Sequence, residues 1–172
     1  CDVFFIKYLS KFCIKNEYQF FILGRPQTQA RMKDEINFYN FYLNKDEWKY
    51  IRPETKQKAS YIEIDKHEIV ASITSTLGYE SLSRKNKTII FDGRHGHCFG
   101  WPKKLNTDGP FWTTEYDTKK LDNIMHFLRT VDDDSWIKVL NPIIKEMMFF
   151  DKDNKIFFQK LKNIKNLKNF LR

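Results

Sequence analysis

The chain is poor in glycine and proline, and it has no long apolar run. Its 172 residues include 6 Gly and 5 Pro, too few for low-complexity linkers. The most apolar early stretch, residues 3–14, carries Lys7 and Lys11. It therefore falls short of the roughly 20 apolar residues with which a helix crosses a bilayer. A P-loop, a Gly-x-Ser-x-Gly elbow and a dinucleotide fingerprint are also absent from the sequence, which leaves no catalytic signature.

Cysteine is scarce, and its positions carry a prediction about biology. The sequence begins with Cys1 and not with Met. Maturation of a bacterial lipoprotein leaves a lipidated cysteine at the new N-terminus, and a truncated sequence is the alternative interpretation. In an exported protein Cys13 and Cys98 are candidates for a disulfide, whereas in a reducing compartment all three cysteines stay thiols.

The composition is that of a folded, basic domain. Hydrophobic residues make up 41% and aromatic residues 16% of the chain, which is too apolar for a disordered protein. The length suits a single domain over residues 1–172. A formal net charge of +8 suits an acidic protein surface, nucleic acid or anionic lipid as partner. An AT-biased coding sequence, which favours lysine codons, explains the same excess of positive charge without any partner.

The first two-thirds of the chain read mainly as strands. Residues 18–23 form a short apolar run that ends at Gly24, and residues 88–91 form a second buried run. Between them we expect two hairpins, one over residues 36–51 and one over residues 61–76, because aromatic and β-branched residues favour strands. Helical spacing within residues 32–43 competes with the first of these assignments.

The last third reads as helices. Apolar residues recur at helical spacing over residues 118–131, over residues 132–150 after an acidic cap, and over residues 154–172. The predicted fold class is therefore α+β: an antiparallel sheet from the N-terminal two-thirds, packed with two or three C-terminal helices. We divide the single domain into a strand-rich part, residues 17–116, and a helical part, residues 117–172.

A glycine-rich loop follows the strand at residues 88–91. Three glycines in eight residues let its backbone turn sharply and approach a ligand. Loops on a rigid sheet often carry function, and the candidates for contact with a partner or ligand are Arg94, His95, His97 and Trp101. Carboxylate, imidazole and thiolate groups also bind Zn²⁺, so a weaker alternative is a metal site of Asp92, His95, His97 and Cys98. A surface loop with only local contacts is the third interpretation.

The C-terminal segment is basic and amphipathic. Residues 154–172 contain no acidic residue, and Phe157, Leu161 and Ile164 fall at helical spacing. Such a helix suits the headgroup layer of an anionic membrane, a nucleic-acid backbone, or the covering of a core. The residues expected at a membrane surface are Lys160, Lys162, Lys165, Lys168 and Arg172.

These observations predict a non-enzymatic protein-binding module without a cofactor, of inhibitor or immunity type. Lipidated Cys1 would anchor it to a bacterial membrane at the extracytoplasmic face. One alternative is a small metal-dependent hydrolase or nuclease that uses the loop from Asp92 to Cys98, with Zn²⁺ as its metal. Another is a basic component of a nucleoprotein assembly, which would place the protein inside the cell.

Overall fold

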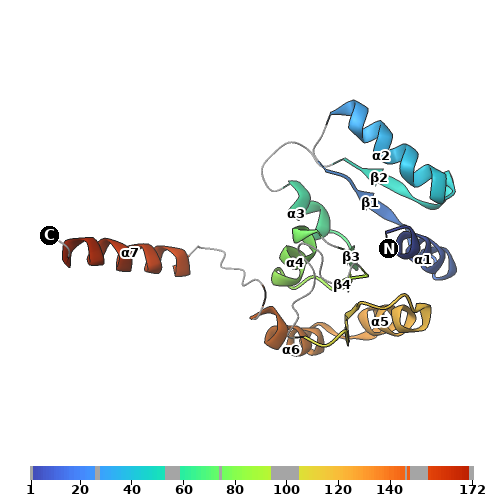
Figure 1. The fold of residues 1–172 in the computed structure, drawn as a ribbon. Coiled ribbons are helices and arrows are strands. Elements are labelled where there is room, and N and C mark those ends of the chain that lie inside the picture. Colours follow the sequence, from blue (N-terminus) through green and yellow to red (C-terminus); the bar gives the residue numbers. More distant parts are fainter. Residues whose placement is uncertain are drawn as a thin grey trace.

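A computed structural model describes residues 2–25, 28–52, 59–73, 75–93, 105–145, 147 and 155–170. Cys1 and the segment from Arg94 to Trp101 lie outside this part of the chain. Helices and strands alternate along most of it, and Figure 1 shows their arrangement. In chain order the elements are α1 (Asp2–Lys15), β1 (Phe21–Leu23), α2 (Gln29–Tyr42), η1 (Lys45–Glu47), β2 (Lys49–Ile51), α3 (Ala59–Ile64), β3 (Val70–Ser72), α4 (Thr76–Ser83), β4 (Thr88–Phe91), β5 (Asp108–Gly109), β6 (Trp112–Thr113), α5 (Thr118–Thr130), α6 (Asp133–Ile144) and α7 (Lys155–Phe170).

The strands form two small sheets. In the first, β1 pairs with β2 in parallel, with Ile22 opposite Tyr50. The second has the order β3-β4-β6-β5. Its β3–β4 and β4–β6 pairs are parallel, and only β5 and β6 are antiparallel. α2 connects β1 to β2 and α4 connects β3 to β4, the usual connection between parallel strands.

The α+β class is confirmed, but the sheet is mixed and not the antiparallel sheet that the sequence predicts. Both expected hairpins are wrong. Residues 29–42 form α2 because Thr28 caps a helix there, its side chain accepting a hydrogen bond from the Arg31 amide. Residues 59–64 form α3, and β3 continues into α4. Three helices therefore interrupt the part expected to be strand-rich.

The predicted buried strands and C-terminal helices are present, but the helix expected over residues 132–150 is the shorter α6, which ends at Ile144. β4 coincides with residues 88–91, and β1 forms within residues 18–23. Asp132 caps α6 by accepting a hydrogen bond from the Ser135 amide at 2.9 Å, as its acidic start indicates. Pro142 lies inside α6 without ending the helix.

The main core surrounds β4. All four β4 residues are buried, with Ile89 and Phe91 at 0% exposure. α1 contributes Phe5, whose ring stacks on that of Phe91 with 4.9 Å between the ring centroids. α6 contributes Trp136, whose ring centroid lies 5.2 Å from that of Phe111. The Trp136 indole also donates a hydrogen bond to the Lys85 carbonyl at 2.8 Å. A smaller core of Ile22, Leu43 and Trp48 joins the first sheet to α2.

The contact between Phe5 and Phe91 predicts that α1 contributes to global stability. Phe5→Ala should lower the free energy of unfolding by about 3–5 kcal/mol, because it removes a fully buried ring and leaves a cavity. Ile14→Ala is the control on the same helix, since Ile14 is 54% exposed, and it should change stability by less than about 0.5 kcal/mol. Urea unfolding measures both. Equal effects would show that α1 does not pack on β4 in solution.

Candidate functional site

The crossover from β3 through α4 to β4 brings a helix N-terminus to the edge of the second sheet. α4 can approach β3 closely because residue 78 is glycine. A Cβ added to Gly78 would lie 2.3 Å from the Ser72 Oγ and 2.4 Å from the Ser72 Cβ. Ser75 caps the helix, its Oγ accepting a hydrogen bond from the Leu77 amide at 3.3 Å.

A buried pair of hydroxyl groups fixes the other end of the same helix. Ser81 of α4 and Thr88 of β4 are both 0% exposed, and their hydroxyl oxygens lie 2.9 Å apart in a hydrogen bond. The Thr88 hydroxyl also donates to the Asn86 carbonyl at 3.0 Å. Because buried polar groups are costly unless they are paired, this pair holds α4 in one position along the sheet.

The parallel strands β3, β4 and β6 all end at one edge of the sheet. Asp92 follows β4 there, is 4% exposed, and donates its amide hydrogen to the Thr113 carbonyl at 3.0 Å. Burial, together with the Asp92 charge, raises the pKa of Tyr79 to about 12. The Tyr116 hydroxyl donates to the Gly93 carbonyl at 3.0 Å. Ligands of open α/β sheets commonly bind outside this edge.

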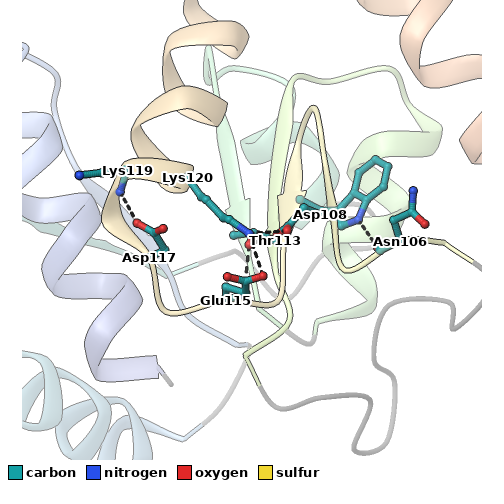
Figure 2. A network of polar contacts seen from close by, with 8 residues as sticks. Asn106, Asp108, Thr113, Glu115, Asp117, Lys119 and Lys120 are labelled. Atoms are coloured by element: carbon teal, nitrogen blue, oxygen red, sulfur yellow. Dashed lines mark hydrogen bonds and ion pairs between the residues drawn. The ribbon is translucent and has the colours of Figure 1, made fainter.

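Figure 2 shows a polar network beside β6. The Lys120 ammonium lies 2.5 Å from an Asp108 oxygen and 2.7 Å from a Glu115 oxygen, and the Thr113 hydroxyl donates to Asp108 at 2.6 Å. These hydrogen bonds raise the pKa of Lys120, that with Asp108 most. Each of these groups has a partner within the network. The network therefore joins the β5–β6 hairpin to the start of α5, and we assign it a structural role.

A cavity of about 400 Å³ lies between the two sheets. Residues of β1 line the cavity on one side, and residues of β3 and α3 line it on the other. Residues of α1 complete the lining. The volume is within the range of small-molecule sites. Most of the lining is apolar and comes from aromatic and aliphatic side chains, which include Phe5, Leu9, Phe12, Phe20, Ile22 and Val70.

The polar lining of the cavity is divided between its two ends. At the carboxyl ends of β1 and β3 lie Arg25, Ser72 and Ser75, together with the start of α4. At the amino ends lie His67 and Glu68. The Glu68 carboxylate accepts a hydrogen bond from the Tyr18 hydroxyl at 3.1 Å. One end thus holds Arg25, whose charge acts on Tyr39 together with the charges of Glu35 and Asp2, and the other end carries acidic groups.

Two further lining groups, Cys13 and Tyr39, are neutral near pH 7, and burial moves their pKa values further from neutrality. Burial raises the pKa of the Cys13 thiol to about 11, and burial followed by the Glu35 charge raises the pKa of Tyr39 to about 12. Neither group adds charge to the cavity. Arg25 is the one lysine or arginine that lines the cavity in the described part of the chain.

The structure places only some of the residues that the sequence singles out. Asp92 lies at the carboxyl edge of β4, where the glycine-rich loop begins. Within the described residues no three His, Cys, Asp or Glu side chains could hold a metal ion together. Cys13 is a half-buried thiol, and its pairing with Cys98 stays a prediction. Outside the described residues lie Cys1, Arg94, His95, His97, Cys98, Trp101 and Arg172.

Arg25, Ser75 and Gly78 are not predicted from the sequence. Ser75 precedes a helix whose buried face consists mainly of small residues, Gly78 and Ser81, beside Leu82. That face gives little apolar periodicity, so the segment does not read as amphipathic. The start of this helix could have been recognised from Ser75, a residue that suits a helix cap and directly follows a β-branched run.

Comparison with known proteins gives one match. The sequence model of a family described as "putative O-antigen biosynthesis protein" matches residues 1–165. This match covers nearly the whole chain. No curated protein and no solved structure matches it.

The close approach of α4 to β3 predicts an unusual effect of a glycine substitution. Gly→Ala inside an exposed helix normally stabilises by up to about 1 kcal/mol. Gly78→Ala should instead destabilise by about 1–3 kcal/mol, because the added Cβ overlaps Ser72. Asn123→Ala, at an exposed position of α5, is the control and should not destabilise.

A double variant tests the cause of that effect. Ser72→Gly removes the atoms that the new Cβ would meet, so adding it to Gly78→Ala should cost less than the sum of the two single substitutions. Thermal unfolding of all four proteins measures the coupling. Strict additivity would contradict the proposed contact between α4 and β3.

Proposed function

The chain belongs to this family, and from that premise we propose that it binds a phosphate-activated sugar in O-antigen biosynthesis. The ligand would occupy the cavity between β1 and β3. The observation that carries the proposal is that this cavity joins the carboxyl ends of β1 and β3, one strand from each sheet, to the N-terminus of a capped helix. That is the part of an open α/β sheet where ligands usually bind.

The chemistry of polysaccharide assembly supports a phosphate-bearing ligand. A sugar unit is transferred more readily when its anomeric carbon carries a good leaving group, and phosphate esters provide one. A phosphate needs positive charge and hydrogen-bond donors. Arg25 supplies the charge at the carboxyl end of the cavity, and the first turn of α4 adds the positive end of a helix dipole.

The apolar part of the cavity suits the less polar portion of such a ligand. Aromatic side chains such as Phe20 and Phe12 line its middle, and flat rings stack favourably on aromatic faces. A nucleotide sugar combines a flat base with a diphosphate, so it would satisfy both the apolar wall and the anion end. The net charge of +8 further favours an anionic ligand.

The functions predicted from the sequence involve other residues. Lipidation of Cys1, partner contacts through His95 and a metal site near His97 all fall outside the described residues, so they stay predictions. The protein-binding module, the hydrolase or nuclease, and the nucleoprotein component likewise stay predictions. None of them makes use of the cavity.

One charge substitution tests the proposed function without weakening the fold. Thr76 is exposed in the first turn of α4. Thr76→Glu should preserve the helix, because acidic residues suit a helix N-terminus, but it adds a negative charge between Ser75 and Leu77, which line the cavity where the phosphate would bind. We expect at least one nucleotide sugar from a panel of uridine, guanosine, thymidine and cytidine compounds to bind the protein. Thr76→Glu should weaken the binding of that compound at least about tenfold.

The matched control adds the same charge at another helix start. Ser135 lies in the first turn of α6, which begins near the amino end of β4: the Lys87 ammonium donates to the Val131 carbonyl at 2.7 Å. Ser135→Glu should therefore leave the affinity within about twofold, as expected for a charge beyond a Debye length. Isothermal titration calorimetry measures both variants. The proposal fails if no nucleotide sugar binds, or if the two variants lose affinity equally.

A further inference from the structure

α7 is an exposed helix with large apolar side chains. Every residue from 155 to 163 is exposed, and Figure 1 shows the helix apart from the sheets. Phe157 and Phe158 are 59% and 55% exposed, and their rings are in contact at 5.7 Å. Ile156 and Leu161 are also exposed, at 46% and 38%. Apolar groups gathered in this way usually mark an interaction surface.

The apolar groups lie together on the helix. Phe157 and Leu161 are four residues apart, so they share one face. Ile156 and Phe158 lie about 100° to either side of Phe157 around the helix axis and widen the apolar side. The opposite face carries polar groups, among them Lys155, Gln159 and Lys162. The described turns of α7 are therefore amphipathic, as the sequence predicts.

The charge of this segment has a single sign. Residues 154–172 contain six Lys or Arg and no Asp or Glu, and Lys160 and Lys162 are exposed beside the apolar face. α2 provides a contrast: it exposes Phe38 and Phe41, but it carries Asp34 and Glu35 as well. A membrane, whose anionic headgroups cover an apolar interior, complements both properties of α7.

We propose that α7 lies in the headgroup layer of an anionic phospholipid membrane. Phe157, Phe158 and Leu161 enter the boundary with the acyl chains, where aromatic and aliphatic groups leave water. Lys160 and Lys162 remain at the level of the lipid phosphates, because their long side chains reach outward from the helix. No described helix is long and apolar enough to cross a membrane. The proposal does not depend on the ligand of the cavity.

Sedimentation of the full chain with vesicles tests the proposal. One set of vesicles mixes phosphatidylglycerol with phosphatidylcholine, and the other is phosphatidylcholine alone. The chain should sediment with the anionic vesicles, less with the neutral ones, and progressively less as salt is added. Lys160→Glu/Lys162→Glu should weaken binding at least about 25-fold, since each lysine near the surface contributes about fivefold. Phe157→Ser/Leu161→Ser should abolish binding.

Lys11→Glu/Lys15→Glu is the control variant. Both lysines are exposed on α1, and the substitutions change the net charge by the same amount, so vesicle binding should stay within about threefold. Equal losses in the two lysine variants would overturn the proposal, because net charge alone would then explain binding. Sedimentation with neither vesicle would also overturn it, as would α7-dependent binding to RNA in place of lipid. Nucleotide-sugar binding should be unchanged in every α7 variant, which separates this proposal from the proposed function.

Discussion

The burial of β4 is the constraint on which the rest of the structure depends. Its backbone pairs with β3 on one side and with β6 on the other, both in parallel. Its side chains contact two helices: Phe91 stacks on Phe5 of α1, and Thr88 forms a hydrogen bond with Ser81 of α4. Two parallel strands need a crossover connection that packs on one face of the sheet. The pairing of β3 with β4 therefore determines where the connecting helix α4 begins. The candidate anion site is a consequence of that position.

The sequence predicts a helix or strand well where the apolar residues of that segment show which of its faces is buried. β4 reads as four apolar or β-branched residues between polar neighbours, and α5 reads as a stripe that contains Leu121, Ile124 and Leu128. Both are confirmed. α2 was assigned as a strand because its aromatic residues favour strands locally, and here the Thr28 cap and packing on the small core of Trp48 prevail. α4 gave no periodic signal because small residues form its buried face.

The site was harder to predict than the elements. The sequence directs attention to the end of β4, where Asp92 opens the glycine-rich loop, and the partner or metal site expected there stays a prediction. It gives no indication that Arg25, after β1, lines the same cavity as Ser75, after β3. These strands belong to two different sheets, and the packing of one sheet against another leaves no local sequence pattern. The sequence predicts a single antiparallel sheet, whereas the cavity lies between two sheets.

The central claim is that the carboxyl ends of β1 and β3, with the start of α4, hold the anionic part of a ligand. Amide chemical-shift mapping during titration with a nucleotide sugar tests it most directly. The account predicts that the largest shifts occur at Arg25, Ser75, Thr76 and Gly78, with smaller shifts along the apolar wall. Shifts confined to the start of α6 or to α7, with none around the cavity, would contradict it.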